Sequence, residues 1–400
     1  MSGALPHASM PAAAGRVVVM HRHTRRGLAV SGAFAIAALV AALVPHDTGA
    51  WLPLHLFFAG SLATAISTVT LMLAVTWSAA PAPSEPLMSM QRWMLAAGAL
   101  AVAAGREGDS RLLTGVGGGA VVAALALVGA LLVTIRRRGS TDRYLPAIDA
   151  YLLALTAAVG GVALGIWIGA VRLSAQLREA HLLANLLAFV GVVIAGTVPY
   201  FVATQARVKM SPWATPRRIR AATSTMWAAA VASAVAAAGG HRDLVAIALV
   251  VYAAGIVAIG ALLPRPTGKS LIWAGPRLTE LLLGLAWWAA MVVHAATTWG
   301  RTGIEHATLL ALVVGGFGQI LAASFAYLVP VVRGGGHEAL TAGFRRTRSW
   351  VGLLLANAAA VLALAGQERA MLAMVGLWIA DAAARSAIVG GCRSLRERRD

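Results

Sequence analysis

Twelve long apolar segments run through the chain, and they constrain its fold more than any other feature. Each is close to the roughly 20 residues that an α-helix needs to cross a hydrocarbon layer about 30 Å thick. Inside a bilayer every backbone N–H and C=O group must find its partner within its own segment, so we expect helices. The segments cover residues 27–44, 53–77, 91–105, 112–135, 145–171, 181–205, 221–239, 243–263, 277–299, 306–332, 349–366 and 369–390.

The charged residues are too few to cover a soluble globule. The chain is 59% hydrophobic and 12% charged, with a mean hydropathy of +0.76, whereas a soluble domain carries about 25% charged residues. We therefore predict an all-α integral membrane protein: a basic tail of residues 1–26, a membrane domain of residues 27–390 that begins without a cleavable signal peptide, and a basic tail of residues 391–400. Cys392 is the single cysteine, which rules out an internal disulfide bond.

Topology explains the net charge of +18, which is almost entirely arginine. If the N-terminus is in the cytoplasm, 26 of the 33 Lys and Arg residues lie on the cytoplasmic side and seven lie outside. Because Lys and Arg concentrate in cytoplasmic loops, we predict that both termini are cytoplasmic. The lipid bilayer is then the expected partner, and the charge gives no reason to propose nucleic acid.

Three histidines recur at nearly equal intervals along the chain. His55, His181 and His306 are 126 and 125 residues apart, and each opens a segment that runs from outside to inside. A small residue follows ten positions after each one (Ala65, Gly191, Gly316). The spacing predicts three pseudo-symmetric repeats of four helices, with one histidine per repeat at the same depth. Histidine is the commonest metal ligand, although a histidine at a helix mouth also sits stably in the polar interface.

The segments around these histidines resemble a bacterial membrane family. The stretches are LHLFFAGSLATAI from Leu54, AHLLANLLAFVGVVIAGTVP from Ala180 and GGFGQILAASFAYLVPV from Gly315, joined by VTWSAAPAP and RVKMSPWAT. They resemble subunit I of haem–copper oxidases and the NnrS-like haem/copper proteins, whose members are often labelled copper oxidases. The resemblance implies a bacterial plasma-membrane protein with twelve helices in a pseudo-threefold ring, the second, sixth and tenth lining the interior.

The resemblance also implies ligands. It assigns haem b to His55 and His306, which leaves His181, with His294 or His241, for copper or for a hydrogen-bonding role. Copper alone on His55, His181 and His306 is the competing geometry. The sequence departs from the family where a second histidine is expected after His181, and segment 221–239 contains no histidine. We therefore expect no oxygen reduction by a haem–copper pair.

A few polar residues fall inside the apolar segments. Asp381 and Arg385 are one turn apart near mid-membrane, where a carboxylate and a guanidinium either neutralise each other or mark a proton or ion path. Asn185 follows His181 by one turn and could orient it. Gln319 could tie helices together by hydrogen bonds.

Three functions are compatible with this pattern. The first is a membrane haem- or copper-binding protein in redox chemistry or in nitrogen-oxide or copper stress, with an extracytoplasmic copper protein or redox partner. The second is a transporter or channel, which the repeats and Asp381 also suit. The third is a membrane anchor for a separate copper enzyme.

Overall fold

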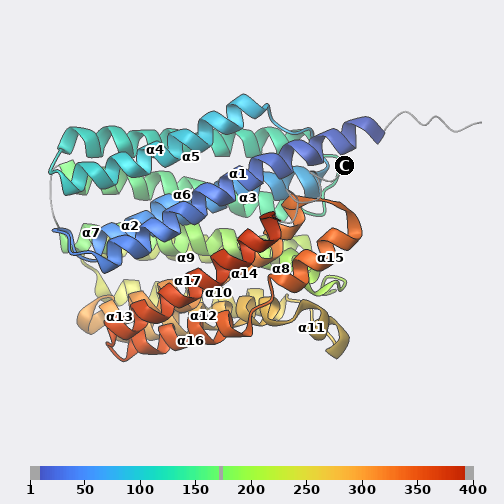
Figure 1. The fold of residues 1–400 in the computed structure, drawn as a ribbon. Coiled ribbons are helices and arrows are strands. Elements are labelled where there is room, and N and C mark those ends of the chain that lie inside the picture. The colour runs from blue at the N-terminus through green and yellow to red at the C-terminus, as the bar shows by residue number, and fades with distance from the viewer. Residues whose placement is uncertain (1–9, 171–173, 392–400) are drawn as a thin grey trace, which may run out of the picture.

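The computed structural model describes residues 10–170 and 174–391, and this part of the chain is a bundle of roughly parallel helices without strands (Figure 1). The prediction of an all-helical membrane protein is confirmed. The α-helices are α1 (Met10–Leu43), α2 (Trp51–His55), α3 (Ala63–Ser78), α4 (Glu85–Glu107), α5 (Arg111–Arg138), α6 (Leu145–Ala170), α7 (Ala175–Leu183), α8 (Val192–Ala206), α9 (Pro216–Ala238), α10 (Arg242–Ala261), α11 (Gly268–Ala274), α12 (Pro276–Thr302), α13 (His306–Ala311), α14 (Gln319–Arg333), α15 (Gly336–Arg346), α16 (Trp350–Leu364) and α17 (Glu368–Gly391).

Eleven helices of the described chain are long and apolar enough to cross a membrane. A twelfth crossing is counted only if α15 and α16, which meet at a 43° bend, form one span. α16 does not count as a crossing by itself because it is too short. Its 15 residues reach about 22 Å, whereas the hydrocarbon core is about 30 Å thick. In Figure 1, α1 begins and α17 ends toward the same end of the bundle.

The predicted N-terminal tail is largely helical. α1 begins at Met10 and continues through the first span to Leu43 without interruption. Residues 1–9 and 392–400, including Cys392 and nearly all of the predicted C-terminal tail, lie outside the described residues.

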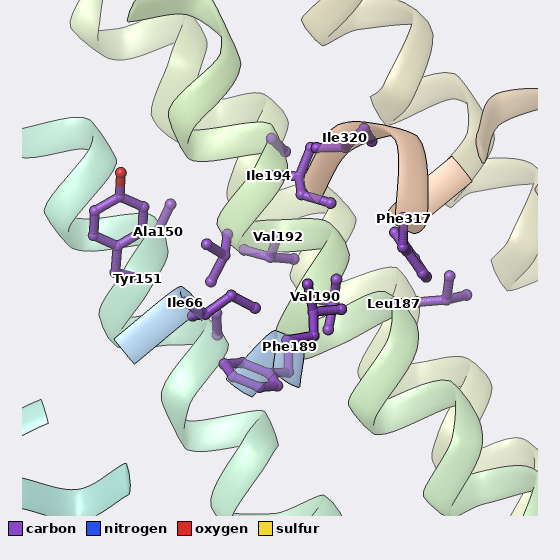
Figure 2. Packing of buried hydrophobic residues seen from close by; sticks show 14 of the residues in the cluster. Ile66, Ala150, Tyr151, Leu187, Phe189, Val190, Val192, Ile194, Phe317 and Ile320 are labelled. Atoms are coloured by element: carbon purple, nitrogen blue, oxygen red, sulfur yellow. The ribbon is translucent and has the colours of Figure 1, made fainter. Parts of the chain in front are cut away.

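Three spans form the centre of the bundle, and they are the ones that begin near the regularly spaced histidines. Spans Trp51–Ser78, Ala175–Ala206 and His306–Arg333 are 78%, 94% and 56% buried, whereas the other eight range from 11% to 44%. Each contains a π-helical segment: η1 (Leu56–Leu62), η2 (Ala184–Gly191) and η3 (Leu312–Gly318). Figure 2 shows side chains from all three spans, among them Ile66, Val190 and Phe317, in one buried cluster.

One buried contact explains how a π-helical segment is accommodated at Gly191. Tyr252 on α10 donates a hydrogen bond of 2.9 Å to the carbonyl oxygen of Leu187, inside η2. A Cβ atom at Gly191 would collide with that same tyrosine hydroxyl. π-Helical segments leave carbonyl groups without their regular helical partner, so a small residue at position 191 admits the side chain that supplies one.

Candidate metal centre

His55 and His181 face each other at one end of the bundle. Their ring centres are 6.1 Å apart and their planes differ by 8°. His55 is the last residue of α2, immediately before η1, and His181 lies on α7 three residues before η2. The two π-containing spans therefore bring together residues that are 126 positions apart in the sequence.

Each imidazole is anchored through the same ring nitrogen. Nδ1 of His55 lies 2.9 Å from the carbonyl oxygen of Trp51, and Nδ1 of His181 lies 2.7 Å from that of Gly161. A carbonyl oxygen only accepts, so each Nδ1 must carry the hydrogen. The neutral rings then present Nε2 with a free lone pair, which is the arrangement found in metal-binding histidines whose other nitrogen donates to a carbonyl.

Neighbouring side chains lie beside both histidines. The indole of Trp51 stacks on His55 with ring centres 3.9 Å apart. The amide of Asn185 donates to the carbonyl oxygen of His181 at 2.8 Å and lies 3.3 Å from its Nδ1. Because that Nδ1 already donates to Gly161, the bond from Asn185 to the backbone is the effective one. Asn185 thus bonds the backbone of His181, and its predicted role in orienting the ring stays a prediction.

Two glycines on α6 make room for this arrangement. A Cβ atom at Gly161 would lie 2.5 Å from the Asn185 side chain, and one at Gly165 would lie 2.7 Å from Cε1 of His181. The two glycines are four residues apart and so share one helix face. Sequence reasoning missed Trp51, Gly161 and Gly165 as parts of this site, although a glycine pair at i and i+4 in a span is a recognisable sign of close packing.

The other predicted ligands lie in different surroundings. Nε2 of His306 is 3.3 Å from Glu368, and the His306 side chain is 51% exposed. Nε2 of His294 is 3.7 Å from Glu305, and His241 is an exposed residue that precedes α10. Within residues 10–170 and 174–391 no group of three or more His, Cys, Asp or Glu side chains could hold one metal ion. The structure thus brings the side chains of His55 and His181 together, whereas His306 contacts the carboxylate of Glu368.

The remaining predicted polar residues stabilise helix contacts. Nε of Arg385 lies 2.9 Å from both carboxylate oxygens of Asp381, and Nη1 donates to the carbonyl oxygen of Arg348 at 2.8 Å. Gln319 and Asn357 exchange two amide hydrogen bonds of 3.3 Å between α14 and α16. Asn357 also accepts a bond of 2.9 Å from the indole of Trp287. These bonds connect the short α16 to the bundle.

No family model matches the chain, and no curated protein sequence matches it either. The fold and the site define the class of protein on their own: a polytopic helical membrane protein with two anchored imidazoles at one end of its central helices.

Proposed function

We propose that this is an integral membrane metalloprotein that holds one copper ion between His55 and His181. The observation that carries the proposal is the parallel pair of imidazoles whose Nδ1 atoms both donate to backbone carbonyls. Imidazole suits copper, and the affinity of nitrogen sites for divalent metals peaks at Cu²⁺. Bound copper would supply one-electron redox chemistry, for electron transfer or for nitrogen-oxide or copper stress with an extracytoplasmic redox partner, and not for terminal oxidation.

The two rings lie close enough to share one ion. They are stacked, with their centres 6.1 Å apart, and metal–nitrogen bonds are about 2 Å long, so a shared ion requires the imidazoles to tilt until both Nε2 atoms point at it. The anchoring bonds can persist in that movement, because they involve Nδ1 and leave Nε2 available.

Haem b remains the alternative, either on this pair or on His55 and His306 as the sequence resemblance implies. Phe57 and Phe58 beside His55 offer apolar surface for a porphyrin, and Phe58 lies edge-on to Phe317 with ring centres 6.3 Å apart. The large cavity of the structure, however, is lined by His306 and includes neither His55 nor His181. Copper on His55 and His181 therefore has the stronger geometric support.

Metal and haem analysis of four purified proteins tests this proposal. Wild type, His55→Ala, His181→Ala and His306→Ala are loaded with copper and assayed for bound copper and for pyridine haemochrome. We expect near-stoichiometric copper in wild type and His306→Ala, and its loss in His55→Ala and His181→Ala. Haem that is lost in His55→Ala and His306→Ala but kept in His181→Ala would refute the proposal in favour of the His55–His306 pair.

We further propose that the chain lies in a bacterial plasma membrane with its arginine-rich end, which carries Arg137, Arg207 and Arg333, in the cytoplasm. We also propose that the chain comprises three repeats of four helices. The excess of Lys and Arg at that end supports the orientation. The three central spans, each with a histidine near its start and a π-helical segment, support the repeat. A periplasmic reporter inserted at Gly300 should be active, and one fused after Arg399 inactive; the opposite result would reverse the orientation.

A further inference from the structure

A long cavity lies between α1, α14 and α17. Its volume is about 980 Å³, at the upper end of the roughly 300–1,000 Å³ typical of ligand pockets. On α17 its lining extends from Glu368 to Val389, which is about 30 Å of helix. The walls between these two residues are almost entirely apolar. Because the cavity is about 30 Å long, it extends along most of the thickness of a bilayer. It contains Gly32 on α1, where a Cβ atom would meet nothing within 4 Å.

Arg277 contributes to the lining of this cavity at the arginine-rich end of the bundle, and no described residue accepts a hydrogen bond from its guanidinium. The residue is 2% exposed, and Nε, Nη1 and Nη2 are all buried without a hydrogen-bond partner. Glu280, one turn further along α12, lies within hydrogen-bonding reach of Trp378 and forms no ion pair with Arg277 in the described chain. Within residues 10–170 and 174–391, Arg277 therefore carries a buried charge without a counter-ion.

Aromatic rings surround Arg277 but replace an anion only in part. Its guanidinium carbon is 4.6 Å from the ring centre of Phe344 and 5.4 Å from that of Tyr327. Cation–π attraction offsets only part of the free energy that burial of a charged group costs. Aromatic faces also supply none of the hydrogen-bond acceptors that the buried guanidinium N–H groups require.

The surroundings of Arg277 add positive charge. Trp273 contacts Phe344 and carries Arg207 at 3.6 Å and Arg348 at 5.9 Å from its ring centre. Nε of Arg348 is likewise buried without a partner. Arg25, Arg333 and Arg385 line the same end of the cavity, and the carboxylates there are Glu280 and Asp381, the second of which is held by Arg385. This end is therefore cationic, whereas the walls are apolar.

We propose that the cavity binds an anionic phospholipid, with an acyl chain between α1 and α17 and its phosphate at the cationic end, toward which the buried Arg277 side chain turns when the lipid binds. A phosphate oxygen fits the forked donors of a guanidinium, and the arginine-rich end faces the leaflet in which anionic lipids attract basic residues. The apolar length of the cavity matches an acyl chain better than a small soluble anion. Lipid binding in this cavity does not depend on the metal that we propose for His55 and His181.

Thermal unfolding of delipidated protein in a neutral detergent tests the headgroup. Phosphatidylglycerol should raise the Tm saturably, whereas phosphatidylcholine with the same chains and inorganic phosphate should raise it much less. In Arg277→Met we expect the affinity for phosphatidylglycerol to fall roughly ten- to a hundredfold, because charge-assisted hydrogen bonds are lost. Arg137→Met removes the same charge from an exposed arginine at the same end and should respond like wild type.

A second pair of variants tests the acyl-chain cavity and does not alter any charge. Gly32→Trp would fill the cavity, whereas Gly119→Trp adds the same ring on α5 where a Cβ atom also meets nothing. Only Gly32→Trp should lose the response to phosphatidylglycerol. Equal stabilisation by phosphatidylcholine, an equal effect of phosphate alone, or a wild-type response in Gly32→Trp would each overturn the proposal. If Arg277→Met does not fold, the Gly32→Trp result decides.

Discussion

The two polar sites inside the bundle differ in what holds them. At the histidine end, each imidazole is fixed by a backbone carbonyl and keeps one nitrogen available. At the arginine-rich end, Arg277 rests against aromatic rings and none of its three nitrogens has an acceptor. A polar group in an apolar interior is costly unless it is satisfied. The histidine site is therefore satisfied before it binds anything, whereas burial of the arginine costs free energy that the described residues offset only in part.

The largest effect on this contrast should come from Arg277→Met. Replacing a buried ion pair by apolar residues of similar volume is often neutral or stabilising by about 1–4 kcal/mol, and a lone buried charge lacks even the attraction of a partner. We expect the free energy of unfolding of delipidated protein in mixed micelles to rise within that range. A clear loss of stability would show that Phe344 and Tyr327 already satisfy the guanidinium, and the contrast between the two sites would disappear.

A second prediction concerns the glycines beneath His181. Gly165→Ala places a Cβ atom 2.7 Å from the imidazole, so the ring must move or the helices must separate, at a cost of about 1–3 kcal/mol. We expect a lower Tm and weaker copper binding. Gly160→Ala is the matched control, because a Cβ atom there meets nothing within 4 Å. Equal copper binding by both variants would mean that the position of His181 is not restricted by α6.

The Asp381–Arg385 pair provides a smaller test of how a paired charge differs from the charge of Arg277, which has no partner among the described residues. Its side chains are 20% and 32% exposed, so we expect Asp381→Ala to cost about 1–2 kcal/mol, less than a fully buried pair would lose. Asp381→Ala/Arg385→Ala should recover part of that loss, as measured by the folded fraction after detergent extraction. Normal folding of both variants with an equal loss of activity would instead favour the proton or ion path.

The smallest expected effect is that of Trp51→Ala. It removes the ring stacked on His55, worth about 0.5–1.5 kcal/mol, but leaves the backbone carbonyl that anchors Nδ1. Copper affinity should therefore fall severalfold at most, in a competition assay with a chelator. A complete loss of copper would show that stacking, and not the carbonyl, positions His55.

Much of the architecture could be predicted from the sequence, because a lipid environment leaves an apolar segment little choice but a helix. The histidine spacing also picked out the three spans that prove to be the most buried. The number of membrane crossings was less predictable, because α16 is apolar but too short to span a membrane by itself. Its attachment to the bundle depends on the amide hydrogen bonds between Gln319 and Asn357. The predicted neighbour of His181, Asn185, was found because it is one turn away on the same segment.

The amino-acid sequence by itself determined the helical membrane fold and which central spans carry histidines, since hydropathy and spacing are local properties of the chain. Only the tertiary structure decided which histidines meet. Equal spacing makes His55, His181 and His306 equivalent in the sequence, but the glycines of α6 admit His181 to the interior beside His55, while His306 lies against Glu368 at the surface. That Arg277 finds no acceptor among the described residues is likewise a tertiary property, because whether a charge is satisfied depends on acceptors contributed by distant segments of the chain.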